Sequence, residues 1–165
     1  MMNHSDWQRC LFHHAWLHLA GVAIKEKLVL VRDAMKKEGA TLLLTAALDE
    51  IAWLFNLRGD DVDSTTIFLS YAWVTLDAVR LYINPAKLTD PVRQYLATVG
   101  EGVHIHDYDN FMADLTIFVE KTGEAGSSSS ASVMYDPAKV IRSLSVLNDG
   151  EFIDLFVAFI FSRSL

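Results

Sequence analysis

Two pairs of histidines have the spacing at which side chains bind a metal ion together. His14 and His18 are four residues apart and would share one face of a helix, whereas His104 and His106 alternate and would point to one side of a strand. A protein zinc site, however, uses three or four protein ligands. No cysteine or carboxylate follows either pair at a supporting spacing. Exposed or half-buried histidines are therefore the favoured interpretation, and a metal-binding domain is the weakest of three hypotheses.

Other chemistry-bearing motifs are absent from the sequence. It contains no Gly-x-Ser-x-Gly, no Gly-x-Gly-x-x-Gly and no Gly-x-x-x-x-Gly-Lys-Ser/Thr, so neither a serine nucleophile nor a phosphate cradle is predicted. Asp60, Asp61 and Asp63 are typical of a solvated turn, because a calcium loop needs further regularly spaced ligands and a closing glutamate. Cys10 is the single cysteine and has no local signature of reactivity. We therefore expect no catalytic residue and no metal ligand in this chain.

Charge and length restrict the classes of partner. The 165 residues carry a net charge of −7 with scattered lysines and arginines, which argues against binding to nucleic acid or to an anionic membrane. The most apolar run, Phe152 to Phe161, is about half of the ~20 residues that span a bilayer, and it contains Asp154. The N-terminus lacks a basic region, and three histidines interrupt its apolar stretch, so no targeting segment is predicted. These features favour one domain in the cytoplasm.

The elements that would position functional residues alternate between helix and strand. Apolar spacing of three and four residues indicates helices, and short apolar or β-branched runs indicate strands. The predicted helices are 22–37, 48–58, 90–99, 108–121 and 137–147, and the predicted strands are 41–45, 67–74, 79–83, 103–106 and 133–135. The second and third strands are close enough to form a hairpin, and residues 123–130 are expected to form a flexible loop. The pattern predicts an α/β domain of three layers, α/β/α, with a mixed sheet.

The helix within residues 43–62 has a marked end. Leu48, Ile51, Ala52 and Phe55 follow the helical repeat, acids occupy the first turn, and Arg58-Gly59 come at the end. We expect the Arg58 cation to satisfy terminal carbonyl groups and Gly59 to adopt a positive φ.

The same stretch carries a family resemblance. TAALDEIAWLFNLRG (45–59), followed by Asp61-Val62, Phe68 and Ser70-Tyr71-Ala72, closely resembles the middle domain of Xaa-Pro aminopeptidases (aminopeptidase P). The resemblance extends upstream to Ala20 and, more loosely, downstream to about Leu147. It implies a non-catalytic creatinase/prolidase N-terminal domain of ribonuclease-H-like type. The implied domains are a lead-in segment, 1–21, the α/β domain, 22–150, and an atypical apolar C-terminal tail, 151–165.

Enzymes of this family remove an N-terminal residue that precedes proline. Their catalytic "pita-bread" domain holds two divalent metal ions, commonly manganese, bound by two Asp, one His and two Glu. The resemblance implies that the partners of this chain are that domain and, in the parent enzyme, proline-containing peptides. Since none of the metal residues is visible here, the sequence predicts a truncated chain that is inactive alone and has no cofactor of its own.

Four residues after the matching helix are candidates for the substrate cleft or the interdomain contact. In related enzymes this loop and strand lie toward the catalytic cleft, so Arg58, Asp61, Phe68 and Tyr71 are the implied positions, with a structural role favoured for Arg58. The second hypothesis, from another class, is a stand-alone interaction module that uses the apolar tail as an interface. A second copy of the chain, forming a homodimer, is one further candidate partner.

Overall fold

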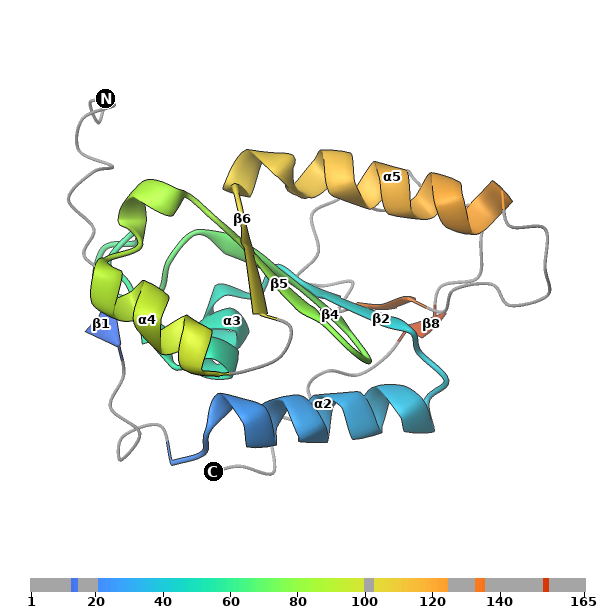
Figure 1. Cartoon of the computed structure of the whole chain (residues 1–165), viewed down its shortest axis with the longest axis horizontal. Helices are drawn as coiled ribbons and strands as arrows, with labels where there is room; N and C mark the ends of the chain where they lie inside the picture. The colour runs from blue at the N-terminus through green and yellow to red at the C-terminus, as the bar shows by residue number, and fades with distance from the viewer. Residues whose placement is uncertain (1–12, 15–20, 100–102, 125–132, 136–152, 155–165) are drawn as a thin grey trace.

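The computed structural model describes residues 13–14, 21–99, 103–124, 133–135 and 153–154. Figure 1 shows these residues in three layers. A six-stranded sheet lies between helix α5 (Phe111–Glu124) on one side and helices α2 (Ile24–Lys37), α3 (Leu48–Phe55) and α4 (Asp90–Thr98) on the other. The predicted three-layer α/β/α architecture is confirmed.

The sheet is mixed, as predicted. Its strands in spatial order are β6 (Val103–His106), β5 (Val79–Ile83), β4 (Ser70–Thr75), β2 (Leu42–Thr45), β7 (Val133–Tyr135) and β8 (Ile153–Asp154). β4 pairs antiparallel with β2 and β5, whereas the β5–β6, β2–β7 and β7–β8 pairs are parallel. β8 belongs to the segment expected as a C-terminal tail, and it forms the edge of the sheet beside β7. A small second sheet pairs β1 (His13–His14) antiparallel with β3 (Leu57–Arg58).

Helix α2 follows from its apolar repeat. Ile24, Leu28, Val31 and Met35 recur at helical spacing and are buried against the sheet layer. Lysines occupy the last turn, and Gly39 follows with φ of 70°, a conformation that glycine adopts without steric cost. The predicted end of this helix is confirmed.

The hairpin of β4 and β5 begins later than predicted. Thr75 closes its turn: the Thr75 backbone N–H donates to the Ala78 carbonyl at 2.9 Å, and the Ala78 N–H donates to Thr75 Oγ1 at 3.0 Å. At the other end, β4 begins at Ser70 rather than Ile67. The physical reason is that residues 67 and 69 bond to Asp61, across the preceding loop, instead of entering the sheet.

Helix α5 is preceded by a 3-10 turn, η3 (Tyr108–Asn110), where Asp107 accepts the Asp109 N–H at 3.2 Å. The helix runs to Glu124, two residues into the segment predicted as loop. Gly123 therefore stands within its last turn, where glycine costs about 1 kcal/mol relative to alanine without forbidding a helix. The serine run, the predicted helix 137–147 and most of the C-terminal tail lie outside the described residues.

The two faces of the sheet bury two separate cores. The larger core packs α2, α3 and α4 against one face and includes Ile51, Phe55, Phe68 and Val74. The smaller core lies under α5 and is formed by Leu42, Leu44, Trp73, Tyr82, Phe111 and Leu115. Because side chains alternate along a strand, neighbouring residues of β4 belong to different cores.

Candidate functional site

The end of α3 is closed by three polar side chains. Asn56 is the left-handed residue, with φ of 51° and ψ of 34°, and its Nδ2 donates to the Val22 carbonyl at 3.1 Å. Lys27 Nζ donates to Asn56 Oδ1 and, at 2.7 Å, to the Trp53 carbonyl. Arg58 Nη1 donates to the carbonyl groups of Ala52 at 3.1 Å and Leu57 at 2.8 Å. The predicted role of Arg58 in satisfying terminal carbonyls is confirmed.

The prediction for Gly59 was wrong. Positive φ angles occur at Gly21 and Gly39 among the described glycines, and not at Gly59. Asn56 takes the left-handed position instead, three residues earlier, because its carboxamide can bond to two neighbouring segments while the backbone turns. A glycine at that position would provide the turn but not these bonds.

Lys27 is a buried cation without a carboxylate among its contacts in the described residues. Its side chain lies in the α2–α3 contact with Nζ 4.3 Å from the centre of the Trp53 ring. Burial lowers the pKa of Lys27 to about 8, and the neighbouring Arg58 charge contributes in the same direction. Sequence reasoning did not single out Lys27, although one signal was available: it lies between Ile24 and Leu28 on the apolar stripe of α2.

The loop after β3, residues 59–69, returns on itself. The Gly59 N–H donates to the Thr66 carbonyl at 3.4 Å and the Asp61 N–H to the Ile67 carbonyl at 3.2 Å. Its tip is exposed, and Ser64 there has φ of 65°. Phe68 anchors the far end in the larger core and is fully buried. Asp61 and Phe68 thus lie at the base of this loop.

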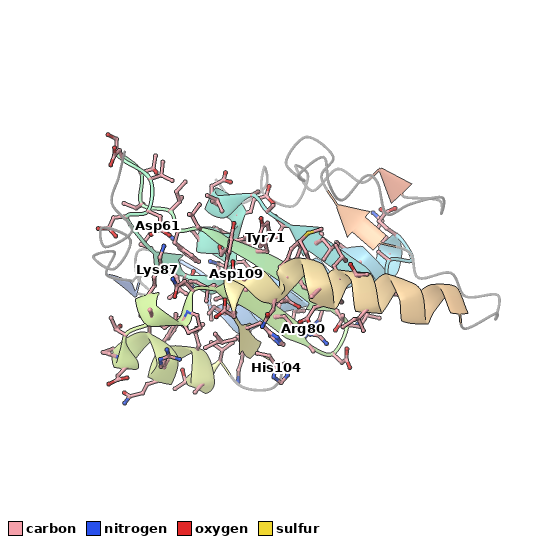
Figure 2. All side chains as sticks on the ribbon, turned by 90° about the horizontal axis from the view of Figure 1, so that it is seen from above. Asp61, Tyr71, Arg80, Lys87, His104 and Asp109 are labelled. Atoms are coloured by element: carbon pink, nitrogen blue, oxygen red, sulfur yellow. The ribbon has the colours of Figure 1, made fainter. Side chains whose placement is uncertain are left out.

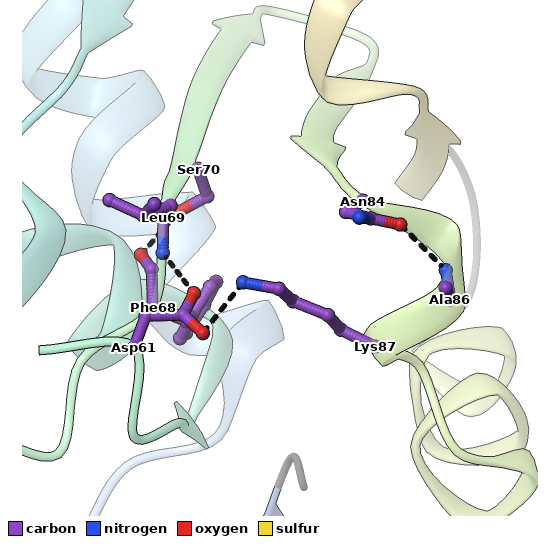
Figure 3. A network of polar contacts seen from close by, with 7 residues as sticks. All are labelled: Asp61, Phe68, Leu69, Ser70, Asn84, Ala86 and Lys87. Carbon is purple, nitrogen blue, oxygen red and sulfur yellow. Dashed lines mark hydrogen bonds and ion pairs between the residues drawn. The ribbon is translucent and has the colours of Figure 1, made fainter. Parts of the chain in front are cut away.

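Asp61 and Lys87 form a buried ion pair, shown in Figure 3. Lys87 Nζ is 2.6 Å from Asp61 Oδ1, and their side chains are 4% and 0% exposed, respectively. The other carboxylate oxygen, Oδ2, accepts the Leu69 N–H at 2.7 Å. Lys87 belongs to η2 (Pro85–Lys87), a 3-10 turn directly after β5. The sequence contained Lys87 in an unremarkable polar context, so only the tertiary structure reveals its partner.

Tyr71 lies on the opposite face of the sheet, under the start of α5. Its ring stacks on Phe111 with centroids 4.1 Å apart, and its hydroxyl accepts a hydrogen bond from Tyr108 Oη at 3.2 Å. Burial and this hydrogen bond raise the pKa of Tyr71 well above its usual range. The four candidate cleft residues therefore divide: Arg58, Asp61 and Phe68 belong to the segment after α3, and Tyr71 to the α5 face. Their orientation toward a catalytic cleft stays a prediction.

Asp114 of α5 is a second polar centre that sequence reasoning missed. Its Oδ2 accepts a hydrogen bond from Tyr82 Oη at 2.9 Å and lies 3.4 Å from His106 Nδ1 and 3.9 Å from Arg80 Nη1. Burial raises the pKa of Tyr82 to about 12. Figure 2 shows Arg80 beside α5 and His104 farther from the helix, and the two residues are register partners on β5 and β6. These contacts tie α5 to the sheet through one carboxylate oxygen.

The two histidine pairs, His14/His18 and His104/His106, were the basis for the hypothesis of a metal-binding domain. His104 is exposed, whereas His106 is half-buried against Tyr82 with ring centroids 5.0 Å apart. His18 lies outside the described residues. Among the residues that the structure describes, no three side chains of His, Cys, Asp and Glu gather as a metal site requires. The hypothesis of a metal-binding domain therefore has no support among these residues.

Comparison with known proteins adds the family. The protein-family model for the creatinase/prolidase N-terminal domain matches residues 8–154, which is most of the chain. The chain belongs to this family. The resemblance noted in the sequence is thereby confirmed, as is the fold class.

Fungal relatives extend the comparison. The chain is 40% identical over 124 residues to the probable Xaa-Pro aminopeptidase P of Sordaria macrospora, covering 75% of this chain and 19% of the relative. It is 41% identical over 108 residues to the corresponding protein of Coprinopsis cinerea, covering 64% of this chain and 17% of the relative. The chain thus spans about a fifth of the length of these relatives.

Solved structures share the fold. The X-prolyl aminopeptidase of Caenorhabditis elegans, described as a cytosolic enzyme with a di-nuclear active site, aligns with a TM-score of 0.71 and 20% identity, covering 77% of this chain and 20% of that one. The N-terminal domain of an X-Pro dipeptidase from Streptococcus pyogenes aligns with a TM-score of 0.50 and 13% identity, covering 78% of this chain and 92% of that domain. Within the described ranges, no helix combines the length and apolarity needed to cross a membrane.

Proposed function

We propose that this chain acts as a non-catalytic domain of an Xaa-Pro aminopeptidase, where it shapes the substrate cleft and contacts a metal-bearing domain. The observation that carries the proposal is the 40% identity to a probable Xaa-Pro aminopeptidase P of which the chain matches only about a fifth. The remaining length of such a relative is sufficient for a separate catalytic domain. The parent enzyme would be cytoplasmic, and its two divalent metal ions, manganese in our proposal, would be bound outside this chain.

The candidate cleft residues take different parts in this proposal. Asp61 and Phe68 are buried, so they would support the 59–69 loop from below rather than touch a peptide. Arg58 donates from Nη1 to the Ala52 carbonyl of α3 and to the Leu57 carbonyl of β3, and would define where the loop begins. Tyr71 is half-buried beneath α5 and would reach an adjoining domain only from that face. The exposed tip between Val62 and Thr66 is the part of this segment available for an interdomain contact.

A chimera tests the proposal directly. The matched 124-residue segment of the Sordaria macrospora relative is replaced by that of this chain, and hydrolysis of an Xaa-Pro peptide is measured with manganese. We expect the chimera to retain turnover, because the domain contributes its fold and surface rather than a reacting group. A control chimera with an unrelated domain of equal length should lose it. A folded, metal-loaded chimera without turnover would contradict the proposed equivalence.

The non-catalytic part of the proposal needs its own assay. The 165-residue chain alone, with manganese, should show no hydrolysis above buffer. Turnover that follows the protein through gel filtration would overturn this part. If the chimera fails while the isolated chain captures a second copy of itself, the stand-alone interaction hypothesis becomes the better one.

A further inference from the structure

The Asp61–Lys87 pair joins the base of the 59–69 loop to η2. The tip of the 59–69 loop is exposed from Val62 to Thr66, so it buries almost nothing against the domain. Ile67 and Phe68 pack against the larger core at the far end of the loop. At the near end, the Asp61 carboxylate holds the loop to η2 through Lys87 and accepts a hydrogen bond from the Leu69 N–H.

Lys87 is presented by a well-supported turn. Asn84 Oδ1 accepts the Ala86 N–H at 3.0 Å, and the Asn84 carbonyl accepts the Lys87 N–H at 3.0 Å. Arg93 Nη2 of α4 donates to the Pro85 carbonyl at 2.6 Å. The turn therefore has its own fixed geometry, and Lys87 extends from it toward Asp61, as Figure 3 shows. If the pair separates, we expect the loop rather than this turn to change conformation.

A buried ion pair contributes little net stability, because removing two charges from water costs about as much as their attraction returns. Its geometry, however, is specific: any loop conformation that separates the two charges breaks their ion pair and leaves a buried charge without that attraction. Here that penalty applies at Asp61, at the base of the loop. The Asp61–Lys87 pair therefore restricts the conformation of the loop more than it raises the free energy of unfolding of the domain.

We propose that the Asp61–Lys87 pair is a conformational lock, which selects one conformation of the 59–69 loop without being required for the folded sheet. The inference concerns the domain itself and does not depend on peptidase activity. Opening of the lock would separate Lys87 Nζ from Asp61 and release the backbone bonds at Asp61 and Leu69, while β2, β4 and β5 remain paired.

Amide hydrogen exchange distinguishes a conformational lock from an ion pair that only stabilises the whole domain. In the double variant Asp61→Asn/Lys87→Met both charges are removed together, and the introduced carboxamide can still accept the Leu69 N–H. We expect the midpoint of urea unfolding to stay close to wild type, while the amides of residues 61 and 69 exchange at least tenfold faster. Amides of β5 should exchange at the wild-type rate. The single variant Lys87→Met, which leaves the buried Asp61 carboxylate without its ion-pair partner, should release the same loop amides more strongly.

Lys36→Met is the matched control, because it removes the Lys36–Asp33 ion pair, whose side chains are 61% and 65% exposed. That variant should leave loop exchange unchanged. Wild-type loop exchange in the double variant would overturn the proposal. An increase in loop exchange that is matched in β5 in both Lys87 variants would also overturn it, since the pair would then act on global stability alone.

Discussion

Lys27 shows how strongly one buried charge can depend on its surroundings. Its ammonium group bonds to Trp53 and Asn56, both at the end of α3, and the Arg58 charge nearby is of the same sign. The protonated form is therefore held in place by acceptors but disfavoured by burial. Both effects arise because a lysine occupies a buried position at the α2–α3 contact.

The lowered pKa of Lys27, about 8 against 10.5 for an ordinary lysine, makes stability depend on pH. Below pH 8 both the native and the unfolded chain hold the proton, and the native state carries the cost of a buried charge. Between pH 8 and 10.5 the native state loses the proton first, so the free energy of unfolding rises with pH. This contribution should increase by about 2 kcal/mol between pH 7 and 9.5.

Urea unfolding of wild type, Lys27→Met and Lys27→Arg at pH 7 and 9.5 measures this effect. The difference in unfolding free energy between wild type and either variant should change with pH in favour of wild type, because methionine and arginine do not titrate in this range. The measurement stops at pH 9.5, since tyrosines with raised pKa values, such as Tyr82, reverse the trend above pH 10. Parallel profiles for all three proteins would show that Lys27 remains protonated throughout.

At the scale of elements, α5 depends on polar contacts as well as on aromatic packing. Phe111 packs against Tyr71 and Tyr82 at the start of the helix, and Asp114 one turn later bonds to Tyr82. His106 of β6 lies beside the same carboxylate. The helix is thus attached to β4, β5 and β6 by its first two turns.

The titration of His106 reports on this attachment. Burial lowers the pKa of His106, the Arg80 charge and His104 act in the same direction, and Asp114 opposes them. Asp114→Asn should therefore lower this pKa further, whereas Arg80→Met should raise it. Because the native pKa is below that of the unfolded chain, His106 stabilises the fold above pH 6.5, and this contribution is lost as the pH falls through the native pKa.

The NMR chemical shift of the His106 ring proton, followed from pH 4.5 to 8, distinguishes the two variants. Opposite displacements of the His106 pKa support the cluster. Equal displacement in both variants would indicate that substitution loosens α5 rather than changing the charge at His106. Tyr71→Phe is a control on the same face, because it keeps the stacking on Phe111 and removes only the hydroxyl.

At the scale of the whole molecule, the order of strands in the sheet decides which strand edges are paired, and local sequence patterns do not reveal that order. β2 is central: β4 pairs with one edge and β7, from far along the chain, with the other. Its residues Leu42, Leu43 and Leu44 are all buried. Without β7, β2 would become an unpaired edge strand with three consecutive leucines, which favours association of chains.

Chains that end at residue 124 and at residue 154 test this role of β7. The shorter chain should form oligomers in light scattering coupled to gel filtration and should melt at a lower temperature. The longer chain, which retains β7 and β8, should behave as the full chain does. A monomeric shorter chain with the full melting temperature would show that the β2–β7 pairing contributes little.

Local sequence patterns were sufficient for most elements of this domain. The helical repeat of α2 and α3, the hairpin of β4 and β5, and the proline at the start of α4 each depend on neighbouring residues, so their positions could be predicted within a few residues. The fifteen residues 45–59 also sufficed to recognise the family that the comparisons confirm. The end of α3 was predicted at Arg58-Gly59, three residues after the observed end at Phe55, since spacing alone does not distinguish a left-handed asparagine from a later glycine.

Only the tertiary structure decided which charged groups meet. Asp61 and Lys87 are 26 positions apart, and Tyr82 and Asp114 are 32 apart. Asp61 and Lys87 meet because the segments after β3 and after β5 converge at one end of the sheet. Tyr82 and Asp114 meet because α5 packs on the sheet face to which the Tyr82 side chain points. Burial, and hence the pKa of Lys27 and the isolation of the Asp61–Lys87 pair from water, follows from that convergence. A local pattern in one sequence contains the charges but not the distance between them.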